Sequence, residues 1–264
     1  MSRARDGSGA VAEARPPARS QGGGARPRHG GRDDEPAYVL HAYPFKETSL
    51  IVEIFSRNSG RLGLVARGAR RPRSALRGML MAFQPVSLDW AGKSELRTLL
   101  RAETLAGHAQ LCGMSLMCGF YLNELLLKLV PREDPHADLY LAYEAALGAL
   151  RTEQPVAWTL RRFEKQLLRE LGYGLLLEQD AHGAAIDPQA RYTYVLEAGP
   201  TLLAQASRGA VELTGKTLVD MAADDYRRAA TLQESRTLMR YVLNHYLAGQ
   251  ILHTRQLLLE LQHT

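Results

Sequence analysis

The sequence predicts an α+β chain with two domains: an N-terminal all-β barrel, followed by a mainly α-helical domain that carries a small β-hairpin. Residues 37–104 contain five short, apolar, β-rich segments separated by turn residues, which favours a small barrel over an open sheet. Beyond Leu111 the spacing of apolar residues changes to the period of an amphipathic helix. With 264 residues the chain is long enough to form two hydrophobic cores.

The N-terminal residues 1–36 differ in composition from the rest of the chain. Arg, Gly, Ala, Pro and Ser dominate, aromatic residues are absent, and large aliphatic residues are almost absent. Such a segment buries too little apolar surface to offset the entropy lost on ordering. We therefore expect a disordered tail over residues 1–36. Its arginines either add weak affinity for a polyanion or have no role, and the sequence leaves both possibilities open.

The barrel is expected over residues 37–108. Alternation is clear in the second β segment, where Leu50, Val52 and Ile54 share one face and Glu53 lies on the other. Polar and glycine-containing turns separate the segments. The predicted strands cover residues 37–43, 48–57, 61–68, 85–91 and 95–103.

The helical domain is expected over residues 109–264. An apolar stripe that includes Leu122, Leu126 and Leu129 predicts its first helix, which ends at Pro131. Four further long segments have the same period, and less regular sequence lies between the third helix and the fourth. The further helices are predicted at 136–150, 155–171, 232–248 and 255–262, and the intervening region 173–230 is predicted to hold a hairpin (191–196 with 201–204) and helical pieces at 207–213 and 216–222.

The most informative stretch runs from Ile54 to Leu88, which contains no Asp or Glu. A run of one sign creates a local field that attracts a polyanion, and nucleic acid is the polyanion that such runs most often bind. The run passes from a strand into a loop, where Gly68 and Pro72 interrupt regular structure. Small barrels that bind nucleic acid carry basic loops of this kind, although a solvated surface loop would have the same composition. The arginines of the run are Arg57, Arg61, Arg67, Arg70, Arg71, Arg73 and Arg77.

The candidate nucleic-acid contacts form two basic groups and an aromatic pair. The first group comprises the arginines from Arg61 to Arg77. The second comprises Lys93, Arg97 and Arg101, of which the two arginines are four residues apart and are expected to share one face of a strand. Tyr43 and Phe45 are candidates for base stacking, although either ring could instead belong to the core. Phosphate contacts should dominate, because such a patch supplies charge without base-reading side chains.

The sequence argues against several other classes of function. It contains no nucleophile elbow, no H-E-x-x-H pair and no dense carboxylate group, so we expect no enzyme, and the sparse carboxylates argue against a metal-dependent nuclease. The glycines at 209 and 215 are one residue too far apart for a phosphate loop. Cys112 and Cys118 would lie about 120° apart on a helix, which predicts neither a disulfide nor a metal pair and suits a reducing cytoplasm. No segment is apolar enough over ~20 residues to span a membrane.

Polar residues beside apolar stripes suggest two readings for the helical domain. Glu124 on the first helix could form an ion pair with Arg161 or Arg162 on the third, as a structural contact between helices. Alternatively, one of these arginines could accept the carboxylate of an acidic peptide at the rim of an apolar groove. The residues alone favour the ion pair.

Eight segments of the chain carry recognisable motifs: 38–40, 46–50, 60–61, 65–70, 96–99, 121–125, 161–164 and 171–173. Together they resemble the RecO family of bacterial DNA repair proteins. The resemblance spans about residues 37–262 and keeps the family's motif order. It implies an N-terminal oligonucleotide-binding (OB) barrel and a non-catalytic recombination mediator that binds single- and double-stranded DNA. It also implies strand annealing and help in loading RecA onto DNA coated by single-stranded-DNA-binding protein, with RecR as a partner.

The resemblance also reverses the order of the two readings for the helical domain. It implies that this domain docks the C-terminal tail of single-stranded-DNA-binding protein, with Arg161, Arg162 and Phe163 as candidate contacts. Many family members carry a four-cysteine zinc module that corresponds to 173–230 here, but no cysteine occurs in the matching segment 177–183. We therefore expect no metal or other cofactor, and a module held by packing alone. The resemblance implies a cytoplasmic, nucleoid-associated protein; an RNA-binding barrel of translation or RNA decay is the alternative.

Overall fold

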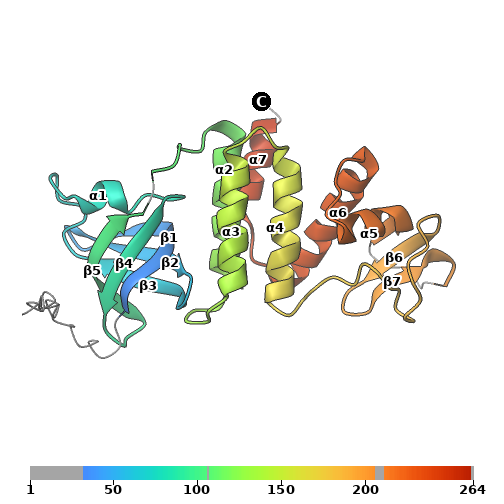
Figure 1. Cartoon of the computed structure of the whole chain (residues 1–264), viewed down its shortest axis with the longest axis horizontal. Helices are drawn as coiled ribbons and strands as arrows, with labels where there is room; N and C mark the ends of the chain where they lie inside the picture. The colour runs from blue at the N-terminus through green and yellow to red at the C-terminus, as the bar shows by residue number, and fades with distance from the viewer. Residues whose placement is uncertain (1–31, 106, 206–210, 263–264) are drawn as a thin grey trace, which may run out of the picture.

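The computed structural model describes residues 32–105, 107–205 and 211–262 (Figure 1). The barrel lies at one end of the molecule, helices occupy the middle, and a small second sheet lies at the other end. Residues 1–31 of the expected tail are outside the described residues. For residues 32–36 the expectation of disorder is wrong, because they belong to the first strand: Arg32 pairs with Trp90 and Glu35 with Leu88. Pairing with a neighbouring strand orders a segment that its own composition would leave disordered.

Five strands close into a barrel in the order β1-β2-β3-β5-β4, which confirms the predicted barrel. All neighbours are antiparallel except β3 and β5. Val52, Ile54, Leu64, Leu88 and Trp90 are all buried in its core. The strands are β1 (Arg32–Phe45), β2 (Ser49–Ser56), β3 (Gly60–Ala66), β4 (Pro85–Ala91) and β5 (Leu96–Thr104), with the short helix α1 (Leu76–Met79) between β3 and β4.

The helical domain contains the predicted long helices. Its core is built from their apolar faces, with Leu122, Leu147, Leu167 and Leu243 fully buried. In the amphipathic α4, Phe163 and Leu167 face this core while Arg162 and Arg169 are exposed. The long helices are α2 (Gly113–Leu129), α3 (Ala137–Leu150), α4 (Val156–Glu170), α6 (Ala229–Tyr246) and α7 (His253–Gln262).

The barrel packs directly against the helices. Tyr38 and Phe55 belong to the core of the helical domain, and the ring centroids of Tyr38 and Tyr143 are 5.2 Å apart. Asn123 donates a hydrogen bond to the Leu40 carbonyl oxygen (2.9 Å) and accepts one from the Tyr143 hydroxyl (2.5 Å). Strands β1 and β2 therefore bury both faces along part of their length, one in each core.

The small sheet has the order β7-β6-β8 and confirms the predicted hairpin. The helix expected at 207–213 is wrong where the structure describes it: Val211–Thr214 forms a strand that pairs with β6. Its side chains alternate, since Val211 and Leu213 are buried while Glu212 is exposed, and this is strand periodicity. The elements are β6 (Arg191–Val195), β7 (Gly199–Leu202), a 3-10 turn (Leu203–Gln205), β8 (Val211–Thr214) and α5 (Gly215–Ala222), the last of which was predicted at 216–222.

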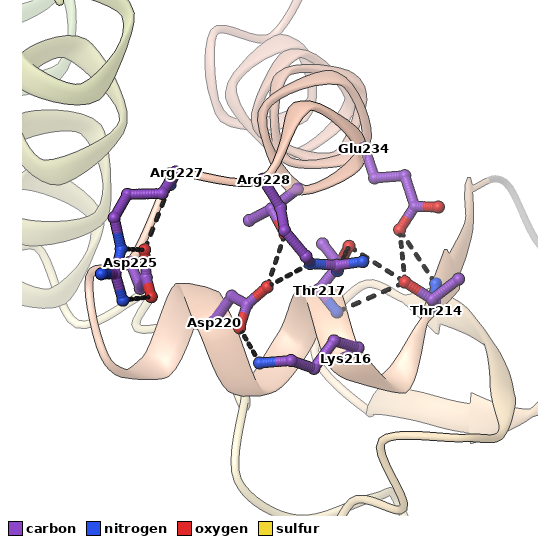
Figure 2. A network of polar contacts seen from close by, with 9 residues as sticks. Thr214, Lys216, Thr217, Asp220, Asp225, Arg227, Arg228 and Glu234 are labelled. Carbon is purple, nitrogen blue, oxygen red and sulfur yellow. Dashed lines mark hydrogen bonds and ion pairs between the residues drawn. The ribbon is translucent and has the colours of Figure 1, made fainter.

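A polar network joins this module to α6, so it is not held by packing alone as expected (Figure 2). Asp220 is buried on α5 and accepts hydrogen bonds from Arg228 Nε (2.8 Å) and Thr231 Oγ1 (2.6 Å), and it forms an ion pair with Lys216. Glu234 of α6 accepts from both the amide and the hydroxyl of Thr214, the N-cap residue of α5. Burial alone would raise the pKa of Asp220, but the hydrogen bonds from Lys216, Thr231 and Arg228 outweigh it and lower that pKa.

Candidate functional site

The arginine loop, residues 67–77, leaves the barrel after β3 and carries five exposed arginines. None of them forms an ion pair with a residue that the structure describes. In the helical domain, by contrast, most arginines either form an ion pair or line a pocket. The base of the loop is nevertheless fixed. Ala69 is buried in the barrel core, and the Arg70 amide donates to the Thr48 carbonyl oxygen at 2.9 Å. The five exposed arginines are Arg67, Arg70, Arg71, Arg73 and Arg77.

An aromatic surface lies beside the arginine loop on the outside of the barrel. Tyr43, Ile51 and Val65 are register neighbours across β1, β2 and β3, and Tyr43 is 45% exposed. Phe45 is half-buried at the end of β1 and has the Lys46 ammonium 5.3 Å from its ring centroid. Neither Tyr43 nor Phe45 belongs to a buried core, which answers the question that the sequence left open.

The turn that carries Lys46 also contacts the loop. Arg70 Nη1 donates to the Lys46 carbonyl oxygen at 3.1 Å, so the β1–β2 turn and the arginine loop form one continuous surface. Lys46 is exposed and was missed by the sequence analysis. Its position next to Phe45, at the end of a predicted strand, was the feature of the sequence that could have identified it as a candidate contact.

Arg61 lies between the barrel and the helical domain. It forms an ion pair with Glu53 (3.3 Å) and donates from Nε to the Val130 carbonyl oxygen (2.9 Å). Glu53 also binds Arg132, from the segment that links α2 to α3. Burial lowers the pKa of Arg61, and the nearby Glu53 carboxylate opposes this. Arg61 therefore joins the two domains, and its predicted contact with nucleic acid stays a prediction.

Arg97 and Arg101 also have carboxylate partners and do not share a face. The register of β4 and β5 shifts between Asp89 and Trp90, so that Leu99 and Ala102 both enter the core although they are three residues apart. This irregularity breaks the alternation that placed the two arginines together.

The two arginines are neutralised at different places. Arg97 is 2.9 Å from Glu133, while Arg101 contacts Glu103 (2.6 Å), Asp34 and Asp89. Of the second basic group, only Lys93 is exposed without an ion pair to a described residue.

A second candidate site is a cavity of about 470 Å³ between α2, α4, α6 and α7, which we call the arginine-lined pocket. Apolar side chains, including Met114, Val156, Leu160 and Leu232, form much of its wall. Positive charge is contributed by three different helices. The arginines in its lining are Arg161, Arg236, Arg240 and Arg255.

The charge in this pocket is poorly compensated. Burial lowers the pKa of Arg240, and the charges of Arg255, Arg236 and Arg161 lower it further. Arg161 is 2.6 Å from Glu164, which is fully buried and accepts a hydrogen bond from the Tyr121 hydroxyl (2.7 Å). Burial raises the pKa of Glu164 despite these partners. Four cations thus surround an apolar cavity with one carboxylate in its lining, which suits an anionic ligand with an apolar side chain.

The structure separates the three residues predicted for partner binding. Arg161 lines the pocket, Arg162 is exposed outside it and donates to the Asp224 carbonyl oxygen (3.0 Å), and Phe163 is buried in the core. The predicted ion pair between Glu124 and Arg161 or Arg162 is wrong. Glu124 instead accepts hydrogen bonds from the amides of His253 and Thr254, the first residues of α7.

Arg236, Arg240 and Arg255 were missed by the sequence analysis. Arg236 and Arg240 are four residues apart on α6, so they share a helix face, and this spacing was the signal that could have found them. Arg255 carried no such signal, because tertiary contacts with Glu124 of α2 and Asn244 of α6 bring α7 to the pocket.

Neither candidate site contains an arrangement for metal binding. Within the described residues, no group of three or more His, Cys, Asp or Glu side chains is placed to hold a metal ion. Cys118 lines the arginine-lined pocket, and burial raises the pKa of its thiol to about 11, so it is protonated at neutral pH. No helix in the described part of the chain is long and apolar enough to cross a membrane.

Comparison with known proteins gives consistent matches over both domains. The family model described as recombination protein O N terminal matches residues 33–108, and that described as recombination protein O C terminal matches residues 114–256. A protein named DNA repair protein RecO from Aromatoleum aromaticum is 53% identical over 231 residues, covering 87% of this chain and 96% of the relative. The protein of the same name from Nitrosospira multiformis is 52% identical over 233 residues (88% and 96%). That from Paraburkholderia xenovorans is 49% identical over 234 residues (87% and 77%).

Proposed function

Because this chain belongs to the RecO family, we propose that it is a recombination mediator in DNA repair. In this proposal it binds single- and double-stranded DNA, anneals complementary strands and helps load RecA onto DNA coated by single-stranded-DNA-binding protein. It works with RecR, in the cytoplasm and at the nucleoid, and it is not an enzyme. The names of its relatives support the DNA repair role, and they do not favour the RNA-binding alternative.

The observation that carries the DNA-binding part is the arginine loop. Its five exposed arginines lack acidic partners among the described residues, so their charge is available to phosphates. The loop is fixed at its base by Ala69 and by the Arg70 amide, which limits the entropy lost on binding. Tyr43 and Phe45 lie beside it and offer ring surface for stacking bases of a single strand. Charge and aromatic surface without a base-reading pattern suit binding without sequence preference.

The arginine-lined pocket supports the partner-binding part of the proposal. The C-terminal tail of single-stranded-DNA-binding protein is acidic and hydrophobic, as the family resemblance implies. In the proposed complex, Leu160 and Leu232 contact the apolar part of the tail, and Arg161, Arg236 or Arg240 donates hydrogen bonds to its carboxylates. Arg162 and Phe163 are no longer part of the proposed contact, because one is outside the pocket and the other is buried in the core.

Strand annealing on coated DNA tests the proposal as a whole. Complementary strands saturated with the cognate single-stranded-DNA-binding protein are mixed with the full chain, and duplex formation is followed by fluorescence. We expect annealing to be stimulated, and to be lost when the partner's tail is deleted. Annealing by this chain that is no faster than without it would contradict the proposal. Tighter binding of an RNA oligomer than of the matched DNA oligomer would support the alternative instead.

A further inference from the structure

A third pocket lies in the helical domain, apart from the arginine loop and the arginine-lined pocket. Three segments meet there: the residues that follow α4, the turn between β6 and β7, and the last turn of α6. Its volume is about 340 Å³, and Leu175, Leu196 and Val242 contribute apolar walls. It contains the Gly172-Tyr173 motif, for which the proposed function gives no role.

Two stacked tyrosines form one wall of this pocket. The rings of Tyr173 and Tyr246 are nearly parallel, with centroids 3.9 Å apart and 18° between their planes. Tyr173 remains 46% exposed, so the stack presents aromatic surface to an incoming group. The Tyr173 amide donates to the Leu168 carbonyl oxygen (2.8 Å), and the Leu176 amide donates to the Tyr194 hydroxyl (3.1 Å). The segment that carries Tyr173 is therefore fixed at both ends before any ligand binds.

The one charge in the described lining of the pocket is negative, and the exposed Arg169 lies beside Gly174 at its edge. Glu197, in the turn between β6 and β7, is the one charged residue in its lining within the described chain. Its side chain is exposed and forms no hydrogen bond or ion pair with a described residue. Glu197 lines the same pocket as the two stacked tyrosines, and burial, the Glu197 carboxylate and Tyr173 together raise the pKa of Tyr246.

We propose that this pocket binds the guanidinium group of an arginine presented by a partner protein. A guanidinium is planar and stacks on the face of a tyrosine, while its N–H groups donate to a carboxylate such as Glu197. The leucine and valine walls contact the aliphatic part of the arginine side chain. A nucleobase would stack equally well, but its phosphates would approach a pocket whose described lining carries only negative charge. Charge complementarity therefore favours the arginine.

A peptide titration tests this site separately from DNA binding. Acetyl-Gly-Arg-Gly-amide is added to the full chain, and the ring resonances of Tyr173 and Tyr246 are followed by NMR. A peptide with citrulline in place of arginine keeps the planar group and removes the charge. We expect the arginine peptide to shift both tyrosine resonances and to bind about fivefold more tightly than the citrulline peptide.

Two variants identify the carboxylate that is responsible. Glu197→Gln should weaken binding of the arginine peptide about fivefold. Glu178→Gln changes an exposed glutamate outside the pocket and should leave binding unchanged. Equal binding of the citrulline peptide, or equal weakening by both variants, would overturn the proposal. So would an oligothymidylate that shifts the two tyrosine resonances when the arginine peptide does not, because the pocket would then be a base-stacking site.

Discussion

The arginines of the barrel loop and those of the module around α5 have opposite environments. In the arginine loop, Arg70 and Arg73 are exposed and have no carboxylate partner among the described residues. Beside α5, Arg228 binds the buried Asp220, and Arg227 binds Asp225 through two hydrogen bonds (Figure 2). An arginine without a carboxylate partner is free to bind phosphate, whereas the charge of a paired arginine is already neutralised by a carboxylate of the protein. The comparison separates arginines that bind a ligand from arginines that stabilise the protein.

The largest effect is expected from removing three unpaired arginines. Replacing Arg70, Arg71 and Arg73 by Ala should weaken binding to single-stranded DNA about 100-fold near 0.1 M salt, because ~0.7 counterions per phosphate contact are no longer released. The slope of log affinity against log salt should flatten by about 2 for the same reason. Fluorescence anisotropy over a salt series measures both quantities.

A charge-matched control is needed for this variant. Replacing Arg169, Arg191 and Arg227 by Ala removes the same charge from exposed sites of the helical domain. This control should keep nearly the original slope. If both triple variants lose affinity equally, only net charge matters and the arginine loop is not the site.

Arg161 tests the intermediate case, an arginine that is paired with Glu164 but also lines a pocket. Arg161→Ala should weaken binding of the partner's C-terminal tail peptide roughly 10-fold to 100-fold, since a charge-assisted contact contributes ~1.5 to 3 kcal/mol. Isothermal titration calorimetry with the peptide provides the measurement, and binding to naked DNA should change less than about twofold. Arg162→Ala is the matched control, because Arg162 lies outside the pocket. Equal peptide binding by the original chain and Arg161→Ala would move the docking site elsewhere.

Asp220 should affect stability and leave both binding activities intact. Asp220→Asn removes the charge that accepts from Arg228 and Thr231, and should lower the free energy of unfolding by about 2 kcal/mol. Urea denaturation at pH 7 measures this change. Asp225→Asn breaks a pair at the exposed Arg227 and should cost clearly less. If both variants lost the same free energy of unfolding, the buried network around Asp220 would contribute no more to stability than the exposed Asp225–Arg227 pair.

The contribution of Asp220 to the free energy of unfolding should depend on pH. The folded-state pKa of Asp220 is lowered, so its contribution is fully present above the unfolded-state pKa of about 3.9 and is lost as the pH falls toward the folded-state value. The difference in unfolding free energy between the original chain and Asp220→Asn should therefore be constant from pH 7 to 5 and shrink below about pH 4. A difference that grows on acidification would contradict the assignment.

The smallest effect is expected from chelation. The module around α5 is joined to α6 by a polar network, and in the described part of the chain no group of His, Cys, Asp or Glu side chains is placed to hold a metal ion, so EDTA should leave the melting temperature unchanged. A structural zinc contributes ~10 kcal/mol or more to folding, and its removal would be obvious in a thermal melt. Stoichiometric zinc in the purified protein would contradict this prediction.

The sequence by itself determined the features that depend on local pattern. Apolar residues at period two predicted the barrel, and those at period 3.6 predicted the long helices to within a few residues. The sequence also predicted the arginine loop, because a run of residues without Asp or Glu cannot form ion pairs within itself. Where a strand has too few residues for a clear period, as at Val211–Thr214, the prediction failed.

Only the tertiary structure decided which cations are free and which are neutralised. Arg97 forms its ion pair with Glu133, 36 residues away in the sequence. Arg61 pairs with Glu53 on the neighbouring strand and also donates to the Val130 carbonyl oxygen in the segment that links α2 to α3. The arginine-lined pocket likewise combines Arg161 of α4 with arginines of α6 and α7. Ion pairs and pockets depend on distances in space, and those distances are set by how the two cores pack. The spacing of residues along the chain does not contain that information.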